Sequence, residues 1–508
     1  MKVELSPNAL TVLEKRYLLK DETGKIIETP AGLFHRVAKA IARNKSEQKE
    51  FHALISQLEF LPNSPTLMNA GTELGQMSAC FVLPIEDSLE SIFTTLKNMA
   101  IIQQSGGGTG FSFSHLRPKN DVVKSTHGIA SGPVSFMKVY NTATDVIKQG
   151  GRRRGANMGI LSVHHPDIIE FITSKEKEKT LSNFNISVSA TDQFMKAAEE
   201  RGKYELVNPR TGKTVDCLKA NKVFDLIVEM AWKTGDPGMI FIDEINRRHP
   251  AKRFGRIEAT NPCGEVPLLP YESCNLGSIN LAKMLKGQEI DWDKLERTAV
   301  IAIRFLNHVI DKNRYPIPEI RKATKLTRKI GLGVMGFAEM LIEMGIRYDS
   351  EQAVDLGGKL MQFIYMVAKK NSKRNSTVCT IAPTGTISMI ADCSSGIEPL
   401  FAKEFVKEVL GGVRLKHKLN TRQKDAVVTA LEIAPEWHVR MQAAFQKNVD
   451  NAVSKTINLP ENATLEDVRK SYWLAYKLRC KGITAYRYGS KPEQVLYVED
   501  SGCPECEI

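Results

Sequence analysis

The sequence predicts an α/β fold in which most strands run parallel. Short apolar stretches such as ACFVLPI, GMIFI and STVCTIA alternate with segments that have apolar residues at helical spacing, such as SLESIFTTLKNMAIIQQ, VSFMKVYNTATDVIKQ and VDLGGKLMQFIYMVAKK. This alternation is typical of βαβ units, whose strands lie parallel. The 508 residues are 42% hydrophobic and 25% charged, a composition typical of globular proteins with a large core.

Three regions follow from the order of these elements. Residues 1–60 are predicted to be helical, because NALTVLEKRYLL has helical spacing and TPAGLFHRVAKAIARN offers a Thr cap followed by Pro. Residues 61–490 carry the alternating pattern without a fixed repeat or a low-complexity linker, so we expect one large domain. Residues 491–508 are polar and rich in turn-forming residues, so we expect a mobile tail.

Composition also limits the location and the partners. The amino terminus MKVELSPNAL lacks the apolar region of a signal peptide, and no run approaches the roughly 18 apolar residues of a membrane span, so we expect a cytoplasmic protein with no membrane partner. Nine cysteines, an odd number, argue against a secreted disulfide framework. The net charge of +12 is spread along the chain without a nucleic-acid-binding signature, so we expect small phosphorylated ligands and no nucleic-acid partner.

The stretch NPCGE has the pattern of a reactive site. Asn261, Cys263 and Glu265 alternate, so an extended segment projects an amide, a thiol and a carboxylate to one side. Pro262 fixes φ, and Gly264 permits close approach of a ligand. On the pattern alone, a Pro-Gly turn with an incidental buried thiol has equal weight.

Two further cysteines favour a chemical role for this stretch. Cys274 lies among small and amide residues in ESCNLGSINL, and Cys80 begins a strand-like run in MSACFVLPIEDSLES. Together with Cys263, they can supply one one-electron site and one dithiol.

The stretch APTGTIS suits phosphate binding. Pro383, Thr384, Gly385 and Thr386 lead into SMIAD, where backbone N–H groups and hydroxyls can hold a diphosphate. A plain capped helix explains the same residues equally well, so this motif alone leaves both interpretations open.

Five motifs in order, SPTLMNAG, GGRRRGANMGIL, NPCGE, SCNLGSINL and APTGTIS, resemble those of ribonucleotide reductase catalytic subunits, most closely the class II, adenosylcobalamin-dependent branch. The resemblance runs from about residue 5 to the end of the chain. It implies an enzyme that reduces ribonucleotides, with diphosphates expected, to 2′-deoxyribonucleotides. It also implies a ten-stranded α/β barrel made of two antiparallel halves of five parallel strands, with Cys263 on a central finger loop.

The same resemblance implies a role for each residue of the site. Cys263 matches the cysteine whose thiyl radical removes the 3′-hydrogen, Glu265 the base for the 3′-hydroxyl proton, and Asn261 a hydrogen-bonding amide. Cys80 and Cys274 match the pair that reduces the substrate radical and ends as a disulfide. The scheme is physically coherent, because a 2′-hydroxyl leaves readily only when a radical and a base act next to it.

The resemblance further implies where substrate and effector bind. Residues 383–386 would hold the substrate phosphates, Ser64 would add a contact, and Ala79 would contribute through its backbone. The region 80–160 would bind a deoxynucleotide or ATP effector at a homodimer interface, with nucleoside contacts from Asp87, Ser88 and Leu89 and phosphate contacts from Arg117 and Lys124.

Signalling from the effector is expected to pass through GGRRRGANMG, although Arg152 to Arg154 alone would more often be a solvated charge run. Only about 60 residues precede the catalytic motifs, so no ATP cone and no overall on/off control are expected.

The radical source follows by resemblance and elimination. The end SGCPECEI lacks a glycyl-radical motif, and GITAYRYGS separates Tyr486 from Tyr488, where a class I subunit has two adjacent tyrosines. Adenosylcobalamin is therefore the expected cofactor. A class I-type large subunit that needs a metal-containing partner, or a catalytically inactive nucleotide-binding regulator, remains the alternative.

Two motifs invite other interpretations. GLGVMG fits the dinucleotide pattern G-x-G-x-x-G, but the preceding KATKLTRKI is too basic for a buried strand, so we expect these glycines to serve close packing. Cys503 and Cys506 form a lone C-x-x-C, which is weak evidence for a metal, so no metal site is predicted. A dithiol on a tail better suits exchange with a buried disulfide and with a thioredoxin-like reductant.

Overall fold

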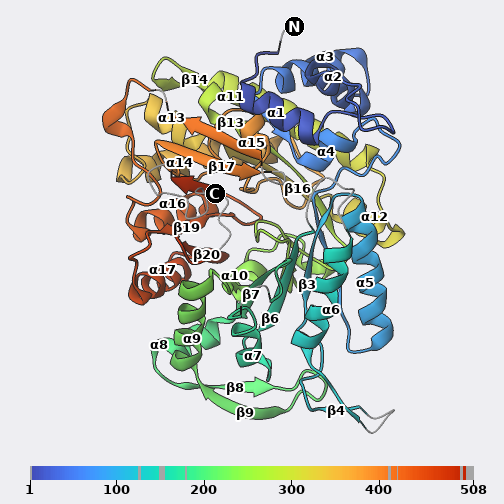
Figure 1. The fold of residues 1–508 in the computed structure, drawn as a ribbon, viewed down its shortest axis with the longest axis vertical. Helices are drawn as coiled ribbons and strands as arrows, with labels where there is room; N and C mark the ends of the chain where they lie inside the picture. The colour runs from blue at the N-terminus through green and yellow to red at the C-terminus, as the bar shows by residue number, and fades with distance from the viewer. Residues whose placement is uncertain are drawn as a thin grey trace, which may run out of the picture.

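The computed structural model describes residues 3–123, 128–147, 155–177, 180–409, 413–419, 421–491 and 496–498. Its main sheet has ten strands (Figure 1). Five of them are parallel neighbours and form the first half of the sheet: β2 (Cys80–Val82), β3 (Gly108–Ser112), β6 (Asn157–Ser162), β7 (Phe184–Ala190) and β10 (Gly238–Phe241). The helices that connect them are α5 (Leu89–Gln104), α6 (Pro133–Val146), α7 (Ile168–Ile172), α8 (Asp192–Glu199) and α9 (Ala220–Thr234).

The second half repeats this arrangement. Its strands are β13 (Ser273–Asn280), β16 (Ile330–Met335), β19 (Thr456–Leu459) and β20 (Gly482–Arg487), in two parallel pairs. Parallel bridges from Leu332 to Cys379 and from Ile381 to Val453 place residues 377–381 between β16 and the approach to β19. Its helices include α11 (Trp292–Lys312), α12 (Pro318–Thr327), α13 (Phe337–Glu343), α14 (Glu351–Lys370), α16 (Pro435–Lys447) and α17 (Leu465–Lys477).

The two halves meet antiparallel at both ends. β2 pairs with β13, and β10 pairs with β20, so antiparallel pairs join the two halves in two places. This confirms the predicted α/β fold with two antiparallel halves of parallel strands. An additional strand, β1 (Phe60–Pro62), pairs antiparallel with β13 outside this repeat.

The amino-terminal helices pack onto the second half. They are α1 (Pro7–Arg16), α2 (Pro30–Ile41) and α3 (Lys45–Ser56), and the short α4 (Ser64–Asn69) follows β1. The hydroxyl of Thr29 accepts a hydrogen bond from Gly32 N, so it caps α2 as its sequence predicts. Phe51 contacts Phe305 of α11 with ring centroids 5.1 Å apart, so these helices share one core with the barrel.

The first five residues of GLGVMG lie in strand β16, and Gly336 follows at the N-cap of α13. A Cβ on Gly331 would lie 2.4 Å from Thr380 Cγ2, and one on Gly333 would lie 2.2 Å from the Thr380 carbonyl oxygen. The glycines therefore serve close packing, as predicted. The preceding KATKLT belongs to helix α12, so no strand leads into them.

Several hairpins fall outside the predicted parallel pattern. They are β4 (Val122–Val123) with β5 (Gly128–Ile129), β8 (Lys203–Val207) with β9 (Thr214–Lys219), β14 (Leu285–Lys286) with β15 (Glu289–Ile290), and β17 (Glu404–Val409) with β18 (Val413–Lys418). Within the predicted tail, Leu496–Val498 form the short strand β21, which pairs antiparallel with β17. Residues 499–508 lie outside the described residues.

Candidate active site

A short hairpin enters the barrel and carries the NPCGE motif at its tip. Its strands are β11 (Ala259–Thr260) and β12 (Pro267–Leu268). The side chain of Asn261 shapes the tip, because its Oδ1 accepts a hydrogen bond from Val266 N at 2.9 Å. Gly264 N donates to the Asn261 carbonyl at 3.0 Å, and Gly264 takes a φ of 78°, which glycine adopts at little cost. Cys263 is exposed between them.

Glycines on β3 make room for the hairpin. A Cβ on Gly110 would lie 1.8 Å from the Thr260 carbonyl oxygen, and one on Gly108 would lie 3.0 Å from Pro262 Cγ. Asn185 Nδ2, from β7, donates to the Pro262 carbonyl at 2.8 Å. The first half of the barrel therefore holds the tip by its backbone.

The second half holds the other side of the hairpin. Thr380 Oγ1 and Ala452 N both donate to the Glu265 carbonyl oxygen, each at 2.8 Å. The Glu265 side chain is buried within the barrel. Because both halves of the sheet hold the hairpin, the position of Cys263 depends on contacts from both halves.

Two cysteines face each other beside the hairpin. Cys80 on β2 and Cys274 on β13 are direct partners across the antiparallel pair, and both are buried. Asn261 Nδ2 donates to Cys80 Sγ at 3.2 Å, which ties the hairpin to this dithiol. Burial raises the pKa of Cys80 well above 9, and the charges of Glu265, Cys274 and Cys263 raise it further. Burial also raises the pKa of Cys274 well above 9, so both groups are neutral thiols near pH 7.

The predicted phosphate loop lies between the barrel and α1. Thr384 has a φ of 53°, and its Oγ1 accepts a hydrogen bond from Gly396 N at 2.8 Å. Thr386 Oγ1 accepts one from Arg16 at 2.8 Å, and Ser64 Oγ lies 2.7 Å from the hydroxyl of Tyr17. Helix α1 thus contacts two of the predicted substrate residues.

The remaining predicted substrate residues have different surroundings. Pro383 precedes Thr384 in the same loop, and a Cβ on Gly385 would meet nothing within 4 Å, so space beside this glycine is open. The helix that follows is short, α15 (Ile387–Ile390), and makes no side-chain cap bond. The backbone of Ala79 is engaged in the sheet, where its N donates to Cys274 O and its carbonyl accepts from Gly108 N.

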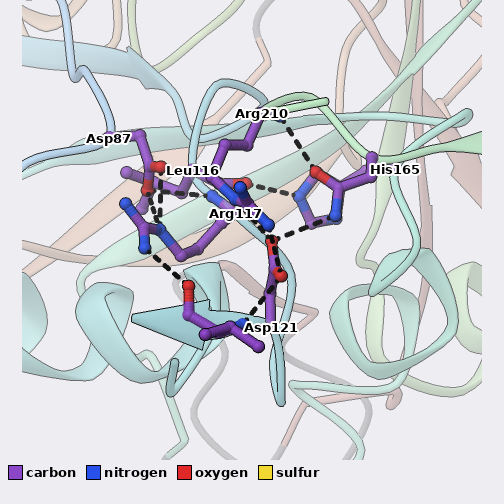
Figure 2. A network of polar contacts seen from close by, with 8 residues as sticks. Asp87, Leu116, Arg117, Asp121, His165 and Arg210 are labelled. Carbon is purple, nitrogen blue, oxygen red and sulfur yellow. Dashed lines mark hydrogen bonds and ion pairs between the residues drawn. The ribbon is translucent and has the colours of Figure 1, made fainter. Parts of the chain in front are cut away.

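The predicted effector residues cluster at the start of α5. Figure 2 shows Arg117 against Asp87, with Nε 2.8 Å from Oδ2, and Arg117 also donates to the Val122 carbonyl. Ser88 caps α5 by accepting from Ser91 N, and Leu89 is 65% exposed. The neighbouring Asp121 is bound by Arg210 in the same view. Lys124 and Arg152 to Arg154 lie outside the described residues, as do Cys503 and Cys506.

A buried ion pair beside the dithiol escaped the sequence analysis. Lys329 Nζ lies 2.6 Å from Glu272 Oε2, and both side chains are 1% exposed. In the sequence, Lys329 appears within a basic run, which usually indicates a solvated face. Arg16, the last residue of α1, and Tyr17, its C-cap, were also missed, because their contacts join segments far apart in the chain.

Among the helices in the described part of the chain, none has the length and apolar character that a membrane crossing requires.

Comparison with known proteins matches most of the chain. A family described as "Ribonucleotide reductase, barrel domain" matches residues 78–374 and 369–486, and one described as "Ribonucleotide reductase, all-alpha domain" matches residues 3–75. The chain is 48% identical to a vitamin B12-dependent ribonucleoside-diphosphate reductase of Thermoplasma acidophilum, over 97% of this chain and 80% of the relative. It is 49% identical to a protein of the same name from Mycobacterium tuberculosis (strain H37Rv), over 97% and 79%. The ribonucleoside-diphosphate reductase large subunit of vaccinia virus is 34% identical over 71% and 51%.

Proposed function

This chain belongs to the ribonucleotide reductase large-subunit family, and on that premise we propose that it reduces ribonucleoside diphosphates to 2′-deoxyribonucleotides with adenosylcobalamin as its cofactor. The names of relatives that align with nearly the whole chain support both the substrate and the cofactor. The observation that carries the proposal is the hairpin that presents Cys263 and Glu265 and joins Asn261 to the Cys80–Cys274 pair.

Substrate activation is the task of the hairpin tip. The Cys263 sulfur, as a thiyl radical, removes the 3′-hydrogen atom of the ribose, and the Glu265 carboxylate accepts the proton of the 3′-hydroxyl. The 2′-hydroxyl then takes a proton from the Cys80–Cys274 dithiol and leaves as water, because the adjacent radical and base weaken its bond to carbon. Fixing of the Glu265 backbone by Thr380 and Ala452 supports this role, since the base must keep its place relative to the ribose.

Reduction is the task of the dithiol. Cys80 and Cys274 supply two hydrogens and two electrons to the substrate and become a disulfide, and Cys263 takes part again when the 3′-hydrogen returns. Burial supports this role, because it raises the pKa of both thiols and so keeps on sulfur the hydrogens that the reaction consumes. The hydrogen bond from Asn261 orients the Cys80 sulfur.

The hairpin tip suits the cofactor. Cys263 is exposed, and a Cβ on Gly264 would meet nothing within 4 Å, so a large group can approach the sulfur closely. Near contact is needed because a hydrogen atom moves from a thiol only over a short distance. Adenosylcobalamin, when bound, supplies the radical equivalent through homolysis of its cobalt–carbon bond. Cys263 and Gly264 would face it, and the two barrel halves hold them in place.

We assign substrate phosphates to Pro383, Thr384, Gly385 and Thr386, and further substrate contacts to Ser64 and the backbone of Ala79. The open space at Gly385 and the side-chain hydroxyls of this loop support phosphate binding. Arg16 of α1 contacts this loop through its hydrogen bond of 2.8 Å to Thr386. The Arg16 guanidinium therefore lies close enough to offset the negative charge of a bound phosphate.

We assign a deoxynucleotide or ATP effector to the region around Asp87, Ser88, Leu89, Arg117 and Lys124, at a homodimer interface. Exposed apolar side chains on α5 and α6, namely Leu89, Phe93, Val139 and Val146, support such an interface, since monomeric proteins rarely expose neighbouring large apolar groups.

A thioredoxin-like protein would restore the dithiol through Cys503 and Cys506. The cytoplasm suits this cycle, because its thiols are kept reduced.

Product formation tests the proposal. The purified chain, without oxygen, receives cytidine diphosphate, a deoxynucleotide effector and dithiothreitol, with or without adenosylcobalamin. We expect deoxycytidine diphosphate only in the presence of the cofactor. Absence of product with adenosylcobalamin, followed by activity when a ferritin-like metal subunit is added, would reject the cofactor assignment in favour of a class I-type subunit.

A further inference from the structure

Two cysteines lie in register on neighbouring strands, and a lysine directly precedes the next strand. Cys80 of β2 is the direct partner of Cys274 of β13. On the opposite edge of β13, Asn275 is the partner of Ile330 in the parallel strand β16. Lys329 precedes Ile330, so it lies alongside Cys274, and partners in register point to the same face of a sheet. A cysteine, a second cysteine and a lysine therefore follow one another across the barrel wall.

Lys329 is held at this position from two sides. Its Nζ lies 2.6 Å from Glu272 Oε2 and donates to the Pro267 carbonyl, on the hairpin strand β12, at 3.3 Å. Glu272 Oε2 also accepts from Leu269 N at 2.6 Å. A buried ion pair of this kind is weak evidence for stability, because apolar residues of the same volume often serve as well. The buried position of Lys329 beside the dithiol therefore points to a chemical role.

The lysine acts unequally on the two sulfurs. Burial is the main influence on Cys274 and raises its pKa, and Lys329 is the next largest and lowers it, ahead of the opposing effects of Glu265, Glu272 and Asp450. On Cys80, burial and the charges of Glu265, Cys274 and Cys263 raise the pKa, and the opposing influence is the neutral amide of Asn261. A full charge stabilises a thiolate more than a neutral donor does.

We propose that Lys329 directs re-reduction of the Cys80–Cys274 disulfide by making Cys274 the sulfur that leaves. This inference rests on the proposed function, which supplies the disulfide. A thiolate of an external dithiol attacks Cys80 Sγ, the bond between the two sulfurs breaks, and Cys274 Sγ takes the electron pair beside the Lys329 ammonium. The second thiol of the reductant then displaces Cys80. The reductant is oxidised to a disulfide, and its two protons end on Cys80 and Cys274.

Accessibility agrees with this direction. Cys80 is 4% exposed and Cys274 is 0% exposed, so an incoming thiolate meets Cys80 first. Exchange is also faster when the leaving thiol has the lower pKa. Lys329 is a positioning residue in this step, because it acts on the charge of Cys274 and exchanges no atoms.

The rate of reduction provides the first test. The full chain is oxidised with diamide, and the loss of the disulfide with dithiothreitol is followed by alkylation and mass spectrometry. The double variant Lys329→Met/Glu272→Gln removes both charges with little change in volume, and we expect reduction about three- to tenfold slower. Glu272→Gln alone keeps the lysine and should reduce at least as fast as the unchanged chain. Lys481→Met is the control. Lys481 is another buried lysine and donates to the carbonyls of Asp450 and Asn451, so its replacement should leave the rate of disulfide reduction unchanged.

The position of the mixed disulfide provides a second test that a purely structural role would not affect. The oxidised chain is quenched during reaction with 2-mercaptoethanol, and the adduct is located by peptide mass spectrometry. We expect the adduct on Cys80 in the unchanged chain, and a larger share on Cys274 in the double variant. Two results would overturn the role of Lys329 and leave the proposed function intact. One is an adduct mainly on Cys274 in the unchanged chain, and the other is a double variant whose rate and adduct position are unchanged. Failure of the unchanged chain to form the Cys80–Cys274 disulfide would overturn this inference together with the dithiol of the proposed function.

Discussion

Cys80 and Cys274 occupy directly opposed positions on the antiparallel strands β2 and β13. Opposed residues in such pairs have Cα atoms about 4.5 to 5.5 Å apart, and a disulfide needs about 4.4 to 6.8 Å. The strand pairing that joins the two halves on this side therefore also sets the two thiols at bonding range. Since Asn261 donates to Cys80 Sγ, the hairpin that carries Cys263 is tied to the same pair.

This relationship predicts a disulfide after one turnover. When the chain reacts with substrate, effector and adenosylcobalamin in the absence of reductant, Cys80 and Cys274 should become linked with about one product formed per disulfide. Peptide mapping by mass spectrometry measures the link. Product formed while both thiols stay available to alkylation would contradict the pairing, and the buried Cys379 serves as an internal control that should remain reduced.

Replacement of Cys263 should abolish ribonucleotide reduction and preserve nucleotide binding. Because Cys263 is exposed at the hairpin tip and its side chain is not needed for the core, Cys263→Ser should fold normally. We expect no detectable deoxynucleotide and a nucleotide affinity within about twofold of the unchanged chain, measured by calorimetry. Measurable turnover by this variant would rule out the assigned radical role.

The fit of the hairpin should depend on Gly110. A Cβ at this position would lie 1.8 Å from the Thr260 carbonyl oxygen, so Gly110→Ala must displace the hairpin or strand β3. Overpacking of this kind costs about 1 to 3 kcal/mol of stability, and we expect a large loss of activity as well. Gly358→Ala in helix α14 is the matched control, because its Cβ would meet its nearest atoms at 4.0 Å. Thermal unfolding and turnover of both variants measure the difference, and equal behaviour would refute the close approach.

His115 should make stability depend on pH. Its ring nitrogens lie 3.1 Å from Glu86 and 2.9 Å from Glu258, which precedes the hairpin. The hydrogen bond with Glu258 is the main cause that raises the pKa of His115 from 6.5 to about 9. A raised folded pKa means that the stabilising contribution is complete below about pH 6.5 and is lost as the pH rises through about 9. The contribution is modest, because the side chain is 41% exposed and solvent screens it.

Urea unfolding of His115→Gln at several pH values checks this expectation. The difference in unfolding free energy from the unchanged chain should be largest near pH 6 and should vanish above about pH 9. A difference that stays constant across the range would contradict the two ion pairs.

Local patterns predicted the local structure well. The apolar spacing of SLESIFTTLKNMAIIQQ predicted α5, Thr29 followed by Pro30 predicted α2, and the alternation of strand and helix predicted the parallel order. The barrel itself came from the resemblance of five motifs, because the pairing of β2 with β13 joins residues nearly 200 positions apart and leaves no local trace.

The parts that sequence alone could not supply depend on tertiary contacts. Lys329 belongs to a stretch that is too basic to predict burial, but Glu272 and the hairpin compensate its charge in the interior. Leu496–Val498 looked like part of a mobile tail, but a distant strand offers an edge to pair with. The contacts of Arg16 with Thr386 and of Tyr17 with Ser64 likewise exist only because α1 folds back onto the barrel.

The most direct test of the account is electron paramagnetic resonance of the chain mixed anaerobically with adenosylcobalamin, effector and substrate. We predict a radical signal whose hyperfine pattern changes when the chain is labelled with β-deuterated cysteine and which is absent in Cys263→Ser. A signal that does not respond to the label, or that persists in Cys263→Ser, would contradict the central claim that Cys263 carries the radical.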